Sequence, residues 1–235
     1  MPNIKDCTVA VIGLGYVGLP LSLAISENKN CLRSNKKLNR NVFGYDNNYK
    51  RIIELKEGFD KNNVFGKEEL SRNKFLKFTN NTVDIKNADV FIVTVPTPID
   101  EEKEPDLSLV KEASAMIGKL INSKNTNKDN QIIIFESTFY PGITEEICIP
   151  IIQDYSKKKY NSFDFKNTFY CGYSPERINP GDDFNTLENI VKITSGSNSE
   201  VGIWIDEFYG SFIKAGTHKV KSIKAAEAAK IIENT

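Results

Sequence analysis

The amino-acid sequence predicts an α/β fold built on a doubly wound parallel sheet. Short apolar segments alternate along the 235 residues with segments whose apolar residues recur at helical spacing. Strands that are apolar throughout are typical of parallel sheets covered on both faces. The predicted strands are 8–13, 41–46, 75–79, 88–95, 131–136, 168–173 and 190–195, and predicted helices include 47–57, 107–121 and 144–155.

The first strand leads into a glycine motif that predicts a dinucleotide site. Gly13, Gly15 and Gly18 form Gly-x-Gly-x-x-Gly between an apolar strand and a helical run. Gly13 permits a tight turn, Gly15 lets the backbone approach a pyrophosphate, and Gly18 lets the helix pack on the strand. The helix N-terminus then offers free N–H groups to the phosphates. We therefore expect a Rossmann-like domain.

Composition excludes several classes of protein. Lys plus Arg and Asp plus Glu are both 31, which argues against a nucleic-acid partner or a membrane surface held by bulk charge. The four cysteines lack metal-ligand spacing and His218 is the only histidine, so we expect no metal and free thiols in a reducing cytoplasm. The apolar run 8–25 contains three glycines and Pro20, and a buried strand with its helix explains it better than a membrane span or signal peptide.

Two polar segments and the last residues complete the predicted layout. Residues 27–41 and 122–130, rich in Asn, Lys and Ser, predict surface loops. Residues 222–235 form a strong helical segment with Ser222 as its N-cap. No Gly or Pro stop signal ends this helix, so we expect it to continue in a longer protein.

An acidic residue after the second strand indicates which dinucleotide is bound. Asp46 follows Gly13 by 33 residues, against about 20 in the usual unit, and the polar segment 27–41 accounts for the excess. A carboxylate here accepts bonds from both ribose hydroxyls and repels a 2′-phosphate, which favours NAD over NADP. Capping of the next helix is the alternative role for Asp46. Arg51 is either a ligand of the adenosine end or a solvated surface residue.

Hydroxyl side chains follow two further strands. Thr97, between two prolines, and Ser137 and Thr138 lie where ligands bind, at the carboxyl edge of a parallel sheet. We expect Thr97 near the cofactor and Thr138 near its nicotinamide end. A rigid turn and a helix cap are the respective alternatives.

Charged residues near the end of the chain are candidates for catalysis. Glu176, beside a proline after a strand, is a candidate base, and Arg177 a candidate for a phosphate or sugar oxygen. Lys230 and Asn234 are four residues apart and share a helix face, where they can stabilise an oxyanion. Solvated surface residues are the alternative for each.

Together these motifs resemble the UDP-glucose/GDP-mannose dehydrogenase family of nucleotide-sugar 6-dehydrogenases. The resemblance covers 9–235, with four motifs in the family's order. The segment Ser-Pro-Glu-Arg-Ile-Asn-Pro-Gly-Asp at 174–182 resembles the branch acting on UDP-N-acetylmannosamine or UDP-N-acetylglucosamine. UDP-glucose is the alternative substrate, and a non-catalytic NAD-binding module is the alternative from another class.

The resemblance assigns residue roles. It implies that Glu176 activates water for hydrolysis of a thioester intermediate and that Lys230 is the acid/base partner of the C6 oxygen, with Asn234 beside it. Arg177 and Ile178 would contact the nucleotide sugar, and Thr138 would lie near the reacting carbon. Contacts to NAD would come from Tyr16, Val17, Asp46, Arg51, Thr97 and Thr138. The implied reaction is two hydride transfers, from alcohol to aldehyde to acid, for surface polysaccharide synthesis.

The chain departs from the family pattern in two ways. The family's nucleophilic cysteine stands in a Gly-x-Cys motif beyond the Lys–Asn helix, and none of Cys7, Cys31, Cys148 and Cys171 has that context. The C-terminal UDP-binding domain is also absent. We therefore expect an NAD-binding domain at 1–215 and, at 216–235, the beginning of a long central helix through which the full-length protein forms a homodimer. We expect the isolated chain to bind NAD without turnover.

Overall fold

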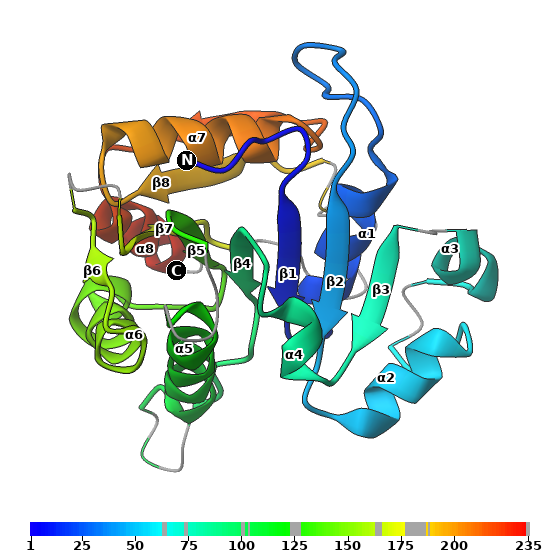
Figure 1. Cartoon of the computed structure of the whole chain (residues 1–235), viewed down its shortest axis with the longest axis horizontal. Coiled ribbons are helices and arrows are strands. Elements are labelled where there is room, and N and C mark those ends of the chain that lie inside the picture. Colours follow the sequence, from blue (N-terminus) through cyan, green and yellow to red (C-terminus); the bar gives the residue numbers. More distant parts are fainter. Residues whose placement is uncertain are drawn as a thin grey trace.

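The fold is an α/β sandwich around one twisted sheet (Figure 1). The structure is a computed structural model that describes residues 1–62, 65–72, 75–99, 102, 104–122, 128–162, 166–176, 187 and 189–233. Nine strands of these residues form the sheet in the order β3-β2-β1-β4-β5-β7-β8-β9, with β6 paired to β7. The strands are β1 (Thr8–Ile12), β2 (Asn41–Tyr45), β3 (Leu76–Thr79), β4 (Val90–Val93), β5 (Gln131–Phe135), β6 (Lys159–Tyr160), β7 (Thr168–Tyr173), β8 (Lys192–Gly196) and β9 (Thr217–Lys219).

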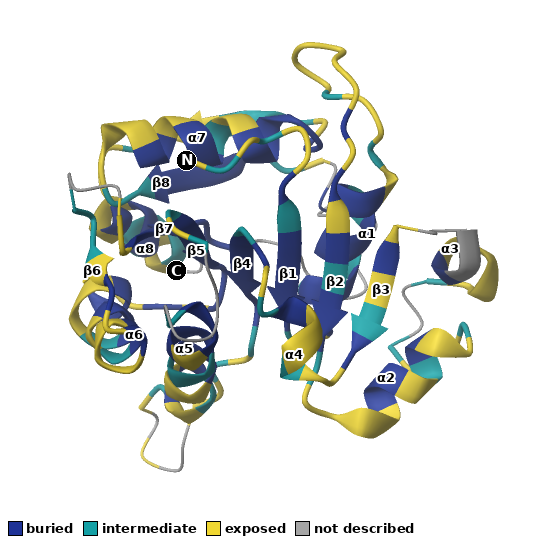
Figure 2. Cartoon of the chain, viewed as in Figure 1, coloured by how far each residue is buried: buried dark blue, intermediate teal, exposed yellow. Residues whose placement is uncertain are grey.

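Helices cover both faces of this sheet. Alternate residues of β1 separate into two cores, with Val9 and Val11 on one face and Ala10 and Ile12 on the other. The first core is covered by α1 (Gly18–Glu27), α2 (Tyr49–Lys56) and α7 (Ser199–Gly210), and the second by α4 (Thr82–Ile85), α5 (Ser108–Ile121), α6 (Ile149–Ser156) and α8 (Ile223–Glu233). A further helix, α3, spans Lys67–Arg72. Figure 2 shows the buried strands between helices whose outer faces are exposed. The predicted α/β fold is confirmed.

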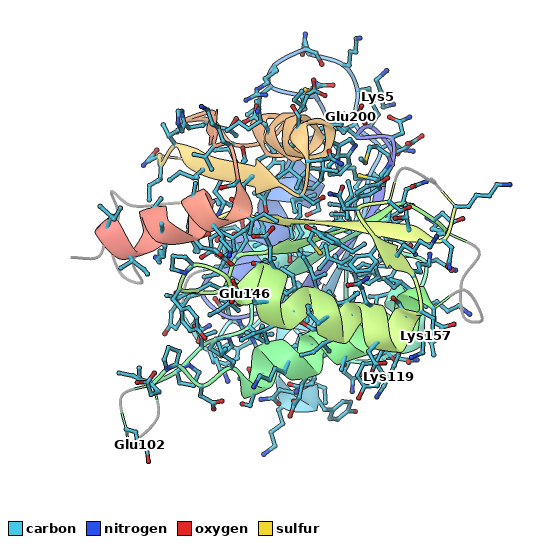
Figure 3. All side chains as sticks on the ribbon, turned by 90° about the vertical axis from the view of Figure 1, so that its left-hand side faces the viewer. Lys5, Glu102, Lys119, Glu146, Lys157 and Glu200 are labelled. Atoms are coloured by element: carbon cyan, nitrogen blue, oxygen red, sulfur yellow. The ribbon has the colours of Figure 1, made fainter. Side chains whose placement is uncertain are left out.

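Charged side chains lie on the outer helix surfaces. Lys119 on α5, Glu146, and Lys157 at the C-cap of α6 are all exposed and extend away from the sheet (Figure 3). This distribution keeps the ionised groups in water and so avoids the free-energy cost of removing their hydration.

One pair of neighbouring strands corrects the prediction of a wholly parallel sheet. β7 and β8 are antiparallel, with Gly172 opposite Gly196 and Tyr173 opposite Ser195, whereas every other strand pair of the sheet is parallel in the described residues. A buried strand has the same apolar composition in either direction, so its sequence pattern carries no information on its direction.

Several predicted elements have different bounds, and some were missed. The predicted helix 144–155 begins as a π-helical turn, η1 (Thr144–Cys148), before α6. Pro150 has no N–H to donate to a carbonyl of this turn, which explains the break in the regular pattern. The helix α7 is not among the predicted elements; its N-cap is Asn198, whose side chain accepts a 2.8 Å hydrogen bond from the Val201 N–H. The elements α3, α4, β6 and β9 were also missed.

The polar segment 27–41 is anchored to the fold. It is a loop, as predicted, but it is pinned to the end of α7, where Leu32 N–H donates to the Ser211 carbonyl at 3.0 Å. Arg33 forms a 2.8 Å ion pair with Asp206 of α7. Of the second predicted loop, residues 123–127 lie outside the described residues.

The C-terminal helix begins where the sequence predicts. Ser222 accepts a 3.2 Å hydrogen bond from the Ala225 N–H, as expected of the N-cap of α8. The preceding strand, β9, lies beyond residue 215 and still pairs with β8. The domain boundary at residue 215 stays a prediction, and the sheet continues past it.

Candidate functional site

The candidate site is a cavity at the carboxyl ends of the central strands. The strand order reverses between β1 and β4, which is where open α/β sheets bind ligands. A cavity of about 800 Å³ opens there, within the size range of ligand pockets. Its lining comes from the loops after β1, β2, β4, β5 and β7 and from α5 and α8, and includes Gly13, Gly15, Tyr16, Val17, Asp46, Arg51, Thr97, Glu136, Ser137, Thr138, Glu176 and Lys230.

The glycine loop has the geometry predicted from the motif. Gly13 has φ +95°, a left-handed conformation that favours glycine. A Cβ on Gly18 would lie 1.8 Å from the Gly13 carbonyl oxygen, so helix and strand approach as closely as predicted. A Cβ on Gly15 would meet nothing within 4 Å, because this residue faces the cavity. The first turn of α1 has neither a side-chain cap nor an acidic residue. The loop therefore fits a pyrophosphate group.

Asp46 lies on the cavity wall and also supports the glycine loop. Its Oδ2 accepts from the Leu14 N–H and its Oδ1 from the Asn48 N–H, both at 2.9 Å. Helix capping of α2 falls instead to Asn48, whose side chain accepts from the N–H groups of Lys50 and Arg51. The predicted ribose contact and the support of the loop are compatible, because a carboxylate has about four acceptor positions.

Arg51 is buried, so its alternative as a solvated surface residue is wrong. Its side chain is 3% exposed, Nε donates to the Leu14 carbonyl at 3.0 Å, and Nη2 lies 2.8 Å from Asp60. Arg51 lines the cavity while it clamps the glycine loop to the segment after α2. Its contact with NAD stays a prediction.

The hydroxyl residues predicted at the carboxyl edge of the sheet lie together in the cavity wall. Thr97 Oγ1 donates to the Thr138 carbonyl at 3.0 Å, which ties the loops after β4 and β5 to each other. Ser137 Oγ donates to the Val95 carbonyl at 2.5 Å and points away from the solvent. Thr138 is exposed towards the cavity, as is Tyr16 at the pyrophosphate end.

Two of the candidate catalytic residues, Glu176 and Lys230, meet at the other end of the cavity. Lys230 Nζ on α8 donates to the backbone carbonyl of Glu176 after β7. The Glu176 carboxylate, 8% exposed at the residue level, accepts from Lys192 Nζ at 2.9 Å. Residues 54 positions apart in the sequence are therefore joined at the cavity wall.

Lys192 belongs to a buried charged cluster that the sequence analysis missed. The cluster consists of Lys192, Glu136, Glu176 and Tyr209: Lys192 Nζ lies 2.7 Å from Glu136 Oε2, and Tyr209 donates its hydroxyl to Glu136 Oε1. Burial raises the pKa of Glu136 to about 7, although Lys192 opposes this shift. Burial alone would lower the pKa of Lys192, but the two carboxylates outweigh it and raise this pKa.

Sequence signals for this cluster exist. Glu136 ends the predicted strand 131–136 and Lys192 lies within the predicted strand 190–195, and a charge in a buried strand needs a partner. Three predicted site residues cannot be placed: Arg177, Ile178 and Asn234 lie outside the described residues.

Comparison with known proteins identifies the family. Residues 7–213 match the UDP-glucose/GDP-mannose dehydrogenase family, NAD binding domain. The chain belongs to this family. The cofactor of the matched domain is NAD. This agrees with the position of the cavity, the open space beside Gly15 and the carboxylate of Asp46 in the cavity wall.

Members of the family cover the whole chain. A UDP-N-acetyl-D-glucosamine 6-dehydrogenase of Pseudomonas aeruginosa is 47% identical over 232 residues, which are 99% of this chain and 50% of that protein. Protein CapL of Staphylococcus aureus is 43% identical over 97% of this chain and 48% of its own length. The structure of the UDP-N-acetyl-mannosamine dehydrogenase Cap5O of Staphylococcus aureus matches with a TM-score of 0.77 and 26% identity, over 97% of this chain and 50% of that chain. The chain thus spans about half the length of these relatives.

The family membership confirms the predicted resemblance and the NAD cofactor. The Pseudomonas aeruginosa relative and Cap5O are dehydrogenases of nucleotide sugars by name. Across the described residues, no helix has both the length and the apolar character that crossing a bilayer requires.

Proposed function

We propose that the chain is the NAD-binding half of a dehydrogenase that oxidises C6 of a UDP-N-acetylhexosamine to the acid. The observation that carries this proposal is the cavity itself. One end has the glycine loop and Asp46, which suit a dinucleotide, and the other has Glu176 and Lys230 in contact with each other. A module that only binds NAD has no need of the second end.

Each residue of the cavity has a separate role in the proposed reaction. When bound, NAD supplies the hydride acceptor for each of the two oxidation steps. Asp46 binds the adenosine ribose, and the exposed Thr138 lies towards the reacting carbon. Lys230 receives and returns the proton of the C6 oxygen, and Glu176 orients the water that releases the acid. Arg177, Ile178 and Asn234 are proposed to contact the sugar.

Support for an N-acetylated sugar comes from the relatives. The Pseudomonas protein at 47% identity is named for UDP-N-acetyl-D-glucosamine, and Cap5O for UDP-N-acetyl-mannosamine. We propose the same substrate class for the whole protein here, in place of UDP-glucose.

Assembly and location are part of the same proposal. We propose that the whole protein dimerises through a central helix that begins with α8, where Ile231 and Ile232 are 45% and 75% exposed. All four cysteines are unpaired, which suits the reducing cytoplasm.

The cofactor site is tested by calorimetric titration of the chain with NAD and NADP. We expect NAD to bind and NADP to bind more weakly. Asp46→Ala removes the ribose acceptor and is expected to weaken NAD binding ~10-fold to ~100-fold, because a hydrogen bond to a charged group contributes ~1.5–3 kcal/mol. It should also narrow the difference between NAD and NADP.

The matched control is Asp84→Ala. Asp84 accepts a 2.5 Å hydrogen bond from Thr79 but is not among the cavity residues. Equal NAD affinity in wild type and Asp46→Ala would contradict the proposed ribose contact.

The substrate is tested by following NADH formation by the whole protein with a panel of UDP-sugars, where two NADH per UDP-N-acetylhexosamine are expected.

A further inference from the structure

The proposed catalytic pair is held by a third residue that none of the motifs includes. Lys192 is the first residue of β8, and its side chain is 5% exposed. Its ammonium lies 2.9 Å from Glu176 Oε2, 2.7 Å from Glu136 Oε2 and 3.3 Å from the Pro175 carbonyl oxygen. These are all three donor positions of a lysine ammonium.

The contacts of Lys192 fix two successive residues of the loop after β7. One bond holds the backbone carbonyl of Pro175 and another holds the carboxylate of Glu176. The backbone carbonyl of Glu176 in turn accepts from Lys230. The position of the Lys230 ammonium therefore depends on a loop whose conformation is set from β8.

Three further titratable groups of the described residues lie around this point. Glu136 directly follows β5, Tyr209 comes from α7, and Tyr173 of β7 donates its hydroxyl to the Ser137 carbonyl at 3.0 Å. Without Lys192, the carboxylates of Glu136 and Glu176 would both lose the cation that lies between them at this buried site. Two such carboxylates repel, and one of them is then protonated or turned away.

We propose that Lys192 is a positioning residue of the active site, which holds the Glu176 carboxylate at the cavity wall and, through the Glu176 carbonyl, the ammonium of Lys230. The inference rests on the proposed function of Glu176 and Lys230. It predicts that the two residues lose their arrangement together when Lys192 is changed.

The test is NMR spectroscopy of the isotope-labelled chain. Side-chain carboxyl signals are followed against pH and assigned with Glu136→Gln and Glu176→Gln, and the ammonium signal of Lys230 is recorded in the same samples. In Lys192→Met we expect the Glu176 titration midpoint to rise by ~1 pH unit or more, since it loses an adjacent cation. We also expect the chemical shift of the Lys230 ammonium to change, and Lys192→Arg to restore most of both changes.

Lys158→Met is the matched control. The Lys158 side chain is also fully buried, where it binds Gln131 Oε1 at 2.9 Å and Asp129 Oδ1 at 3.3 Å, at the start of β5 rather than its end. This variant should leave the signals of Glu176 and Lys230 unchanged. Unchanged signals in Lys192→Met would overturn the inference.

A wild-type measurement keeps the inference testable if Lys192→Met does not fold. We expect a scalar coupling across the hydrogen bond between Lys192 Nζ and the Glu176 carboxyl carbon, and a Lys192 ammonium bound elsewhere would overturn the inference. These readouts are separate from turnover. Failure of the whole protein to oxidise UDP-sugars would remove the proposed function and leave the NMR result standing.

Discussion

Individual residues of the cavity divide into those that the fold requires and those that a ligand requires. Gly18 belongs to the first group, because a Cβ there would lie 1.8 Å from the Gly13 carbonyl oxygen and 2.4 Å from Thr94 Oγ1. Gly15 belongs to the second, because a Cβ there would enter open cavity. The structural role of Gly18 and the ligand-binding role of Gly15 can therefore be separated by experiment.

Substituting each glycine by alanine should impair a different property, stability for Gly18 and NAD binding for Gly15. We expect Gly18→Ala to lower the free energy of unfolding by ~3 kcal/mol or more, because backbone must move to admit the methyl group. Gly15→Ala should leave the melting temperature unchanged and weaken NAD binding ~10-fold, about 1.4 kcal/mol, by pushing the pyrophosphate away.

Thermal unfolding and NAD calorimetry on both variants measure these effects. Each variant is the control for the other, since both add one methyl group to the same loop. A destabilised Gly15→Ala with normal NAD affinity would contradict the assignment of Gly15 to the cofactor.

At the scale of the elements, Glu227 fixes α8 against the loop that carries Thr138. Its carboxylate accepts from the Gly142 N–H at 2.6 Å, the Thr144 N–H at 3.0 Å and the Thr144 hydroxyl at 2.7 Å. Lys230 lies about one helical turn further along α8. The register of α8, and with it the reach of Lys230, is thus tied to the segment before η1.

Replacing Glu227 by Gln should loosen α8. The amide keeps one acceptor but turns an NH₂ group towards backbone donors, so we expect the free energy of unfolding to fall by ~1–3 kcal/mol. We also expect faster hydrogen exchange of the α8 amides. Glu207→Gln, at an exposed position of α7, is the control. Equal exchange of α8 in wild type and Glu227→Gln would show that Glu227 does not hold this helix.

The elements that the sequence predicts well are those with a strong local signal. The apolar runs of β1, β5 and β7 and the glycine turn before α1 were placed within a residue or two. The helix α7 was missed although Val201, Trp204, Ile205 and Phe208 recur at helical spacing and are buried. The strand β8 was predicted at 190–195, but its antiparallel direction could not be, because direction depends on the tertiary path of the chain.

For the whole molecule, the sheet topology explains which site residues the sequence could predict. Asp46, Thr97, Thr138 and Glu176 all follow strands, and parallel strands bring their carboxyl ends to one edge. Lys192 reaches the same edge from the start of a strand because β8 runs antiparallel to β7. A prediction that considers only residues after the carboxyl ends of strands therefore misses Lys192 and the buried cluster that it forms.

That cluster also gives the molecule a pH-dependent stability. The pKa of Glu136 is raised by burial from 4.5 to about 7, so the folded state holds a proton that the unfolded state has released. The contribution is fully present below pH 4.5 and is lost as the pH rises to about 7. Burial also raises the pKa of Glu227, and this contribution has the same sign.

Two buried thiols, Cys7 and Cys148, contribute to stability in a separate, alkaline pH range. Burial raises the pKa of Cys7 and Cys148 from 9.0 to about 12, so their contribution is present below pH 9 and is lost above it. Between pH 7 and 9 neither group changes its contribution. The contribution of these buried groups to stability should therefore fall mainly between pH 5 and 7 and again above pH 9.

The variant Glu136→Gln separates the carboxyl contribution from the rest. Urea unfolding of wild type and variant at pH 5, 6, 7 and 8 gives the free energy of unfolding of each. We expect the wild type to lose ~1–3 kcal/mol relative to the variant between pH 5 and 7, because one pKa unit corresponds to ~1.4 kcal/mol. The remaining decline in the variant includes the contribution of Glu227. If the two curves run parallel across this range, Glu136 is ionised in the folded protein, and Lys192 then outweighs burial at this carboxylate.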